Sequence, residues 1–557
     1  MRMEGHDLVA EVPGAMAGPA VGHAHGDDGW GMPPDYPGIV MYPGEMRARP
    51  DVPPLALIGD ADLPEARPGG VVTLPNGGTL DLEAGLVRRT LRGRTVTMLA
   101  FNGQHPGPLV RVPQDATLFV NFTNRTPFPT TVHWHGVRLD NRFDGVPHLT
   151  QEPVPPGGAF HYRIHFPDAG IYWYHPHHRE DIQQELGLYG NLLVDPGDPN
   201  AYSPVHAEHA LLLDDLLLGE GGIVPFGEAA TTFALMGRFG NVPLVNGEPA
   251  YALEVDRGAV VRFYLTNAAN TRTFNVSFVP EDDPAGEPLP LKVVASDVSR
   301  FGREAWAQNV TIGPAERYVV EARFPRAGRW TLVNRVQAVD HRLGVHFPEV
   351  MPLGTVTVRP VEAVPDLTDA FDRLRADPGL LAQFDTLRAH LARPPDHELI
   401  MTMEADGLPA VVEQIMQFER RYFSPIEWAG TMPMMNWAST GRQVRWVLRD
   451  GATGRENMDI AWRFMVGDLI RIRVVNDAGA FHAMQHPLHI HGQRFLVLAQ
   501  DGVENPHLVW KDTVLLPAGS TTELLLEVSN PGRWMVHCHI AEHLETGMHF
   551  AFEAALP

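Results

Sequence analysis

The chain reads Ser529-Asn530-Pro531-Gly532-Arg533-Trp534-Met535-Val536-His537 near its C-terminal end, and this pattern occurs three times. The earlier copies are Pro167-Asp168-Ala169-Gly170-Ile171-Tyr172-Trp173-Tyr174-His175 and Pro325-Arg326-Ala327-Gly328-Arg329-Trp330-Thr331-Leu332-Val333. A second pattern, a turn followed by a β-rich run and a closing Asn, precedes each copy at 114–124, 257–267 and 467–476. Such runs between turns are typical of strands. The repeat therefore predicts one β-sandwich unit that occurs three times along the chain.

The three copies differ in the residues that begin five positions after the glycine. They are His-Pro-His in the first copy, Val-Asn-Arg in the second and His-Cys-His in the third. The middle copy offers no metal ligand at this place, so we expect it to be structural. Pro176 of the first copy stands where the third copy has Cys538, so only the third copy can provide a thiolate.

Cys538 is the only cysteine of the chain, and it lies between His537 and His539, with His543 and Met548 further on. A single thiolate, imidazoles and a distant thioether form the ligand set of a blue-copper electron-transfer site. Neighbouring side chains of a strand point to opposite faces, so Cys538 would face one metal and the flanking histidines another. For a cysteine taken alone, a small buried core residue is the ordinary interpretation.

Three further histidine clusters favour metal binding over that interpretation. They are His133-Trp134-His135-Gly136, His175-Pro176-His177-His178 and His486-Pro487-Leu488-His489-Ile490-His491-Gly492. Each contains a His-x-His pair, which projects two imidazoles from one face of a strand. Neutral imidazole is a good copper ligand. One such pair is weak evidence, but four clusters with matched spacing in one chain predict copper centres.

The four clusters resemble the copper-binding motifs of the multicopper oxidases, the family of laccases, cuprous oxidases and bilirubin oxidases, over residues 66–557. The resemblance identifies the repeated unit as a cupredoxin domain and implies an all-β chain of three Greek-key sandwiches with four copper ions. It assigns the type 1 copper to His486, Cys538, His543 and axial Met548, the type 2 copper to His133 and His489, and the type 3 pair to His135, His175, His177, His491, His537 and His539. His178 falls outside the motif. The first and third copies supply equal numbers of cluster histidines, so the three-copper cluster would lie between them.

The resemblance also implies an activity. The type 1 copper would take single electrons from a reducing substrate, and the cluster would reduce dioxygen to water. Asp144 matches the family's acid near the cluster, and its alternative interpretation is a turn residue before Gly145. Some bacterial relatives use a Glu directly after the last type 1 histidine to deliver protons. Here that position is Leu544 and the acid is Glu545, which leaves the second proton route open.

The spacing of the copies divides the chain into five segments. The expected boundaries are 1–65 for an N-terminal tail or extended wrap, 66–200, 201–362 and 399–557 for the three cupredoxin domains, and 363–398 for a helical linker. Two helices are expected in the linker, the first capped by Asp366 and the second beginning after Asp377. Their apolar faces would be Leu367, Phe371 and Leu374 in the first, and Leu380, Phe384, Leu387 and Leu391 in the second. The linker would either pack on the surface or form a lid near the type 1 copper.

Composition and charge exclude several classes of function. The net charge of −23 argues against nucleic acid and anionic membranes as partners. No apolar run reaches the ~18 residues that a membrane helix needs. No signal peptide is visible, and a single Cys says little about redox compartment. We expect a monomer, and the resemblance favours an extracytoplasmic or secreted location. Lys292 and Lys511 are the only lysines.

Three interpretations of the substrate and function stay open. A laccase-like enzyme would leave the type 1 edge open to phenols or aromatic amines. A cuprous oxidase acting in copper tolerance would place Met and acidic residues beside that edge. The candidates are Met401, Met403, Met416, Met432, Met434 and Met435, although Met is more often core filler. The chain has no long Met-rich insertion, which favours the laccase. A non-catalytic copper-binding cupredoxin protein would not need the full ligand set.

Overall fold

In the computed structural model, the repeated strands that close with Asn are β5 (Thr117–Asn124), β15 (Val260–Asn267) and β27 (Leu469–Asn476). Each ends at its Asn, as predicted. The buried side-chain amide of that Asn donates to backbone carbonyls of two later segments in all three domains. An Asn side chain has two N–H donors, so one residue satisfies two buried carbonyls. These hydrogen bonds between the strand end and two later segments are the physical reason for the closing Asn.

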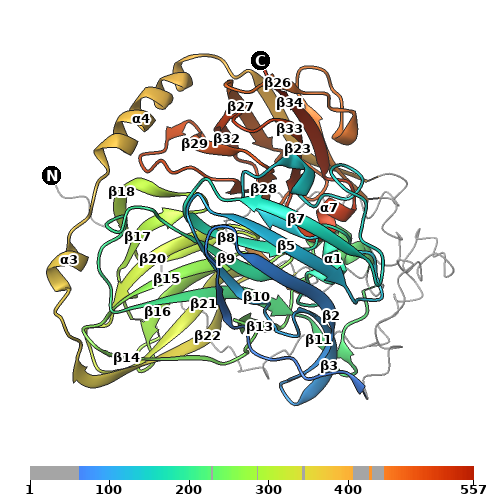
Figure 1. Ribbon diagram of the computed structural model, residues 1–557. Coiled ribbons are helices and arrows are strands. Elements are labelled where there is room, and N and C mark those ends of the chain that lie inside the picture. Colours follow the sequence, from blue (N-terminus) through green and yellow to red (C-terminus); the bar gives the residue numbers. More distant parts are fainter. Residues whose placement is uncertain (1–61, 227–229, 285, 341–344, 406–425, 430–443) are drawn as a thin grey trace.

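The structure describes residues 62–226, 230–284, 286–340, 345–405, 426–429 and 444–557. Within them, the second repeated pattern forms β8 (Gly170–His175), β21 (Gly328–Asp340) and β33 (Gly532–Cys538), each beginning at its Gly. Figure 1 shows three sandwiches that follow one another along the chain, the first blue to cyan, the second green to yellow and the third orange to red.

The first domain is a sandwich of a five-stranded sheet, ordered β1-β4-β9-β8-β6, and a four-stranded sheet, ordered β3-β2-β5-β7. Its other elements are β1 (Val71–Thr73), β2 (Thr79–Leu91), β3 (Arg94–Phe101), β4 (Leu109–Pro113), β6 (His133–His135), η3 (Asn141–Phe143), β7 (Ala159–His165), α1 (Glu180–Gln183) and β9 (Gly190–Asp195). β5 shows the alternation that places a strand in such a sheet: Leu118, Val120 and Phe122 are buried while Phe119 is exposed.

The second domain pairs a sheet ordered β13-β10-β15-β20-β17-β18 with one ordered β14-β22-β21-β16-β19, and β24 lies beside β21. Its other elements are β10 (Ala207–Leu216), the ribbon β11 (Leu218–Gly219) and β12 (Gly222–Ile223), α2 (Ala230–Met236), β13 (Val242–Val245), β14 (Tyr251–Arg257), β16 (Phe274–Pro280), β17 (Leu291–Ser296), β18 (Ser299–Ala307), β19 (Val310–Ile312), β20 (Arg317–Arg323), β22 (Val345–Glu362) and β24 (Ile426–Ala429).

The third domain pairs a sheet ordered β25-β23-β27-β32-β29-β30 with one ordered β26-β34-β33-β28-β31. Its other elements are β23 (His397–Ala405), β25 (Val444–Asp450), η5 (Asn457–Asp459), β26 (Arg463–Met465), β28 (His486–Ile490), β29 (Arg494–Gln500), β30 (Val503–Glu504), β31 (Thr513–Leu516), β32 (Thr521–Glu527), α7 (Ala541–Glu545) and β34 (His549–Ala555). The predicted all-β chain of three cupredoxin-like sandwiches is confirmed.

The predicted helical insertion before the third domain comprises α3 (Thr368–Asp372), α4 (Pro378–Arg388) and η4 (Ala389–Ala392). The Asp377 side chain caps α4 by accepting from the N–H groups of Gly379 and Leu380, at 3.0 and 3.1 Å. Phe384 is buried, with its ring 6.2 Å from that of Trp510. The backbone of Asp377 also donates to Gly302 of β18. The helix therefore packs across the second and third domains, which favours the surface-packing interpretation of the linker.

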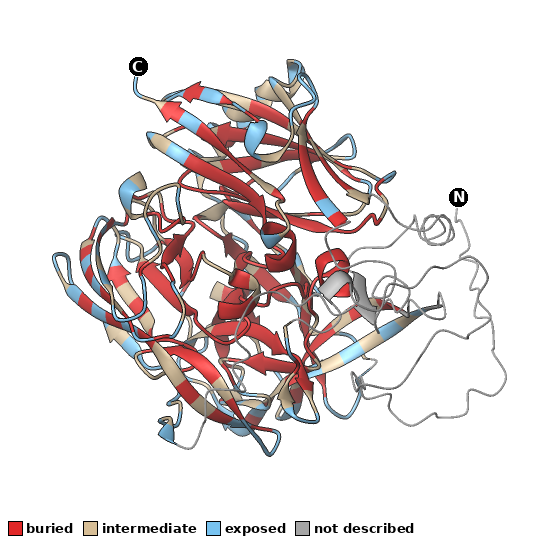
Figure 2. Cartoon of the chain, turned by 90° about the vertical axis from the view of Figure 1, so that its right-hand side faces the viewer, coloured by how far each residue is buried: buried red, intermediate tan, exposed pale blue. Residues whose placement is uncertain are grey.

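Three large clusters of buried apolar side chains fill the sandwiches. Figure 2 shows buried residues lining the strands and exposed residues gathered at loops. Both lysines are buried: Lys292 pairs with Glu321 at 3.0 Å, and Lys511 pairs with Asp297 at 3.1 Å. Among the helices that the structure describes, none has the length and apolarity required to cross a membrane.

Candidate metal centres

Two matched pairs of antiparallel strands present the histidine clusters. In the first domain β6 pairs with β8, so that His133 lies opposite His175. In the third domain β28 pairs with β33, so that His489 lies opposite His537 and Leu488 lies opposite Cys538. The same pair of strands in two copies of one fold therefore delivers both halves of the site.

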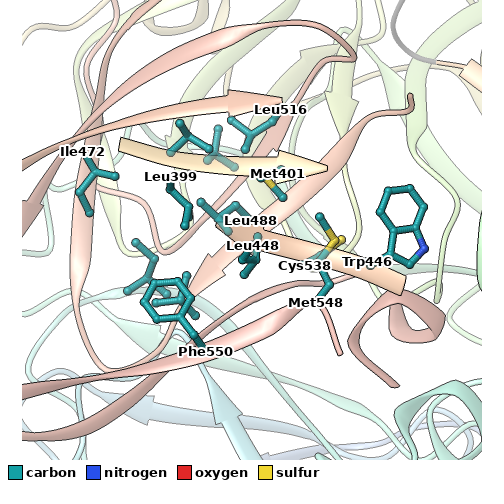
Figure 3. Packing of buried hydrophobic residues seen from close by; sticks show 14 of the residues in the cluster. Leu399, Met401, Trp446, Leu448, Ile472, Leu488, Leu516, Cys538, Met548 and Phe550 are labelled. Atoms are coloured by element: carbon teal, nitrogen blue, oxygen red, sulfur yellow. The ribbon is translucent and has the colours of Figure 1, made fainter. Parts of the chain in front are cut away.

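One thiol and two imidazoles converge at the end of β33. Sγ of Cys538 lies 3.5 Å from Nδ1 of His486 and 3.7 Å from Nδ1 of His543, and all three side chains are buried. The backbone N–H of Cys538 donates to the carbonyl of Met548 at 3.1 Å, and Figure 3 shows both residues among the apolar side chains of the third domain. Burial raises the pKa of the Cys538 thiol and lowers the pKa of His486 to about 3. Neutral imidazoles beside a thiol that a bound cation would ionise fit a soft metal such as copper.

Eight histidines gather in a second group, between the first and third domains. Nε2 of His491 lies 3.3 Å from Nε2 of His177 and 3.0 Å from Nε2 of His537. Two nitrogens bound to one metal at about 2 Å lie about 3.3 Å apart when the geometry is tetrahedral. The other five histidines have a buried ring nitrogen with no hydrogen-bond partner: His133 Nε2, His135 Nδ1, His175 Nε2, His489 Nε2 and both ring nitrogens of His539. Buried polar atoms of this kind are costly unless they bind something, so the residues fit bound metal.

The ring nitrogens that face away from the group are fixed by acceptors. Backbone carbonyls accept from His133 Nδ1 (Asp144, 2.7 Å), His175 Nδ1 (Pro176, 2.8 Å), His489 Nδ1 (Asp512, 2.9 Å) and His537 Nδ1 (Cys538, 2.9 Å). Each of these bonds turns the opposite nitrogen inward and selects the tautomer that leaves it free to bind metal. Burial lowers the pKa of His135, His175, His177, His489, His491, His537 and His539, so these rings are neutral.

Asp144 lies against the same group from the first domain. Its carboxylate is fully buried, with Oδ2 2.9 Å from Nδ1 of His491 and Oδ1 3.3 Å from Nδ1 of His133. Asp144 also precedes a turn, as its alternative interpretation expected. Gly145 in that turn has φ +80°, and an added Cβ would lie 2.0 Å from the carbonyl oxygen of Val132. The position therefore serves the turn and also places a carboxylate against histidines of both domains.

Two further buried acids, which no sequence motif marks as site residues, lie against this group. Oδ1 of Asp512 lies 3.1 Å from Nε2 of His135, and Oε1 of Glu180 lies 3.3 Å from Nδ1 of His177. Burial raises the pKa of Glu180 well above its ordinary value. Burial also opposes ionisation of Asp512, but attraction to Arg317 outweighs it and holds the pKa of Asp512 well below its ordinary value. Glu180 follows His177 by three residues, a spacing that could have marked it; Asp512 has no such local signal.

The second domain covers one edge of the group formed by Cys538, His486 and His543, which we call the thiol–histidine group. Nε2 of His543 donates to the carbonyl of Leu235 in α2 at 3.2 Å, and the ring of His543 stacks on Trp446 with centroids 4.0 Å apart. Trp446 in turn donates its indole N–H to the carbonyl of Ala234 at 2.7 Å. A histidine edge occupied by a backbone carbonyl is not open to direct contact with a donor.

The remaining sequence candidates lie apart from these groups or outside the described residues. Met401 and Met403 are buried in the core of the third domain, where they act as filler. Met416, Met432, Met434 and Met435 lie outside the described residues. His178 is only partly buried, and Leu544 packs on Val146 and Met535.

Comparisons with known proteins agree with this geometry. Two family models described as multicopper oxidase match residues 85–199 and 429–555, which contain all four clusters. The chain is 27% identical to multicopper oxidase MmcO of Mycobacterium tuberculosis, over 83% of this chain and 84% of that protein. It is 26% identical to Laccase-14 of Oryza sativa, over 83% of this chain and 88% of that protein. A solved multi-copper oxidase of Pseudomonas thermotolerans superposes with a TM-score of 0.61 at 27% identity, covering 86% of this chain and 100% of that one.

Sequence motifs, fold and relatives thus point the same way. The convergence of a Cys-His pair and a histidine group on two copies of a cupredoxin fold is the arrangement that the family resemblance implied. The chain belongs to the multicopper oxidases, a family of copper oxidoreductases that use dioxygen as electron acceptor.

Proposed function

We propose that the chain is a laccase-like oxidase that holds four copper ions and couples one-electron oxidation of phenolic or aromatic donors to four-electron reduction of dioxygen to water. The type 1 copper would be held by His486, Cys538, His543 and Met548, the type 2 copper by His133 and His489, and the type 3 pair by His135, His175, His177, His491, His537 and His539. When bound, these ions supply the one-electron redox chemistry and the site at which dioxygen is reduced.

One observation carries the proposal. Cys538 belongs to the thiol–histidine group, while its neighbours His537 and His539 belong to the group of eight histidines. The two groups are therefore joined through covalent bonds of consecutive residues. A non-catalytic copper-binding protein would have no need of such a link, and the link gives an electron a short path through the chain.

Reduction of dioxygen to water also consumes protons, and we assign Asp144 to their supply. Its buried carboxylate contacts the Nδ1 atoms of His133 and His491, which face away from the centre of the histidine group. Asp144 therefore lies behind two of the proposed copper ligands and is not itself a ligand. A carboxyl group in this place can accept a proton and release it toward the site. Glu545 packs near α1, where its carboxylate accepts from the backbone N–H of Glu180, and it is the next acid to consider.

The donor is either an aromatic molecule or Cu(I), and different observations favour each. Met401 and Met403 are core residues, so neither offers a thioether to Cu(I) at the surface, and Laccase-14 is among the relatives. The covered edge of His543 favours the alternative, a cuprous oxidase acting in copper tolerance, because a phenol could not touch that ring without displacing α2. We keep the aromatic donor as the first proposal.

Oxygen consumption by the copper-loaded enzyme separates the two. Matched initial rates with a phenol and with Cu(I), each with copper-free enzyme as the blank, would give a higher kcat/KM for the phenol under the first proposal. A preference for Cu(I) by more than about tenfold, which corresponds to about 1.4 kcal/mol of transition-state stabilisation, would select the cuprous oxidase. We further propose a monomer, and a location outside the cytoplasm, which the family resemblance favours.

A further inference from the structure

The second domain provides no histidine to either group, yet one of its side chains reaches the site. Arg317, at the start of β20, is fully buried. Its Nη1 and Nη2 atoms donate to the two carboxylate oxygens of Asp512 in the third domain, at 2.7 and 2.5 Å. Its Nε donates to the carbonyl of Ile171 in the first domain at 3.0 Å, and Nη1 also donates to Ala315. One guanidinium thus connects all three domains, and its bidentate bond fixes both the position and the plane of the carboxylate.

Asp512 transmits that fixed position to two histidines. Its Oδ1 lies 3.1 Å from Nε2 of His135 and 3.5 Å from Nδ1 of His489, and its backbone carbonyl accepts from the same Nδ1 at 2.9 Å. An ionised carboxylate only accepts, and the Thr513 hydroxyl, which lies 3.0 Å from the same Nε2, donates to Oδ1 of Asp512 at 2.8 Å. Nε2 of His135 is therefore the protonated nitrogen. The nitrogen left free is Nδ1, the atom without a partner in the histidine group. His135 thus presents Nδ1, whereas His133, His175 and His489 have their free nitrogen at Nε2.

The residue after His135 gives independent evidence for this arrangement. Gly136 has φ +84°, and an added Cβ would lie 2.5 Å from Oδ2 of Asp512 and 2.6 Å from Nη2 of Arg317. The Asp512–Arg317 pair therefore packs directly over the backbone of the His-Trp-His-Gly motif. The glycine of that motif is needed both for the backbone conformation and to make room for the pair.

We propose that Arg317, contributed by the domain without ligands, is a positioning residue of the three-copper cluster that acts through Asp512 on His135 and His489. The guanidinium holds the carboxylate, the carboxylate selects the tautomer and orientation of the His135 ring, and the ring then presents Nδ1. The second domain is thereby part of the cluster's supporting shell and more than a spacer. The inference rests on the ligand set of the proposed function.

The chain offers two matched controls for this residue. Lys511, next to Asp512, crosses the same interface to Asp297 at 3.1 Å and Glu316 at 3.3 Å. Arg262 lies on β15, next to β20 in the same sheet, and pairs with buried Glu321 at 2.7 Å. Both are buried cations in ion pairs, and the described contacts of neither include a histidine of the two groups. Asp297 also lies 3.4 Å from Nη1 of Arg317, so Arg262, which shares no carboxylate with Arg317, is the stricter control. Replacing Lys511 shows what loss of a buried charge does to the interface between the second and third domains. Replacing Arg262 shows what the same loss does within the second domain.

The experiment compares copper-loaded Arg317→Met, Arg317→Lys, Lys511→Met and Arg262→Met with the parent enzyme. Copper per chain and the electron paramagnetic resonance spectrum of the type 2 copper report on the cluster, and the blue absorption band reports on the type 1 site. Arg317→Met should weaken copper retention at the cluster about 10- to 100-fold and change the type 2 hyperfine coupling, with the blue band kept. Arg317→Lys should recover part of the loss, because it keeps the charge and loses the bidentate bond. Lys511→Met and Arg262→Met should keep the type 2 spectrum.

Coupling to Asp512 gives a second measurement, which also serves if Arg317→Met does not fold. In an Asp512→Asn background, Arg317→Lys should cause little further change in the type 2 spectrum, because the residue acts through that carboxylate. An unchanged type 2 spectrum and copper content in Arg317→Met, or an equal change in Arg262→Met, would overturn the inference. Additive effects of Arg317→Lys and Asp512→Asn would overturn it as well. A parent enzyme with no blue band or fewer than four coppers would instead refute the proposed function.

Discussion

Cys538 and His537 are consecutive residues of β33 whose side chains lie in different groups. Sγ of Cys538 lies 3.5 Å from Nδ1 of His486, and Nε2 of His537 lies 3.0 Å from Nε2 of His491. The alternation of side chains along a strand produces this separation, and no insertion or special loop is needed. A Cys at the end of β33, directly after a His, can therefore join two metal centres through the backbone of two consecutive residues.

Replacement of Cys538 by Ser tests that link. A hydroxyl offers a hard oxygen where the blue site needs a soft thiolate, so Cys538→Ser should lose the blue band and nearly all oxidase activity. The histidine group faces the other way and should keep its copper, measured as three coppers per chain with an unchanged type 2 resonance. A Ser variant that stays blue would show that Cys538 is not the type 1 ligand.

Replacement of Met548 by Leu tests the axial position. A weak thioether donor stabilises Cu(II) slightly, so its loss should raise the type 1 reduction potential while colour and copper content remain. We expect a rise of at least about 60 mV in a redox titration, which corresponds to a tenfold change in a one-electron equilibrium. Met535→Leu is the matched control on β33, and its potential should equal that of the parent. A Met548→Leu potential at or below the parent value would remove Met548 from the ligand set.

Replacement of Asp144 by Asn separates proton supply from electron supply. The amide keeps the shape and the acceptor toward His491 but cannot carry the proton. Reoxidation of the reduced enzyme by dioxygen should slow by roughly 10²-fold, while anaerobic reduction of the blue copper is unaffected. Stopped-flow absorbance resolves the two halves, and Asp140→Asn at the start of η3 is the control. Equal slowing of both halves would assign Asp144 a structural role in the turn before Gly145.

The sequence predicts those parts of the site that carry a local signature. The closing Asn residues, the glycines that begin β8, β21 and β33, and the four histidine clusters all lie at fixed spacings within one strand or turn, so a repeat reveals them. Arg317, Asp512 and Leu235 carry no such pattern. Arg317 meets Asp512 across 195 positions of the chain, and Leu235 meets His543 across 308. Only the packing of the second domain against the third brings these residues together, and that packing has no counterpart in any single stretch of sequence.

His105 should make stability fall in acid. Its Nδ1 accepts from Arg89 at 2.6 Å and its Nε2 contacts the hydroxyl of Tyr189 at 3.3 Å, in a buried network apart from the histidine groups. Burial and the charge of Arg89 lower the pKa of His105 from 6.5 to about 3. The unfolded chain binds this proton below pH 6.5 and the folded chain does not, so stability is full above that pH and is lost as the pH falls toward 3.

The effect is measurable as a difference in the slope of the free energy of unfolding against pH. Copper-free parent and His105→Gln are unfolded with denaturant between about pH 6.5 and 4, where one such proton contributes about 3 kcal/mol. The variant should be less stable at neutral pH and lose less stability in acid than the parent. The exposed His161→Gln variant is the control and should keep the parent slope. Parallel curves for parent and His105→Gln would contradict the assignment.

Two copper centres joined at Cys538 should together carry four electrons to one dioxygen molecule. The direct measurement is the stoichiometry of the copper-loaded enzyme with a one-electron donor, with oxygen uptake, oxidised donor and hydrogen peroxide recorded in one reaction. Four donor molecules should be oxidised for each dioxygen consumed, with no peroxide released. Two donors for each dioxygen, with an equal amount of peroxide, would contradict it.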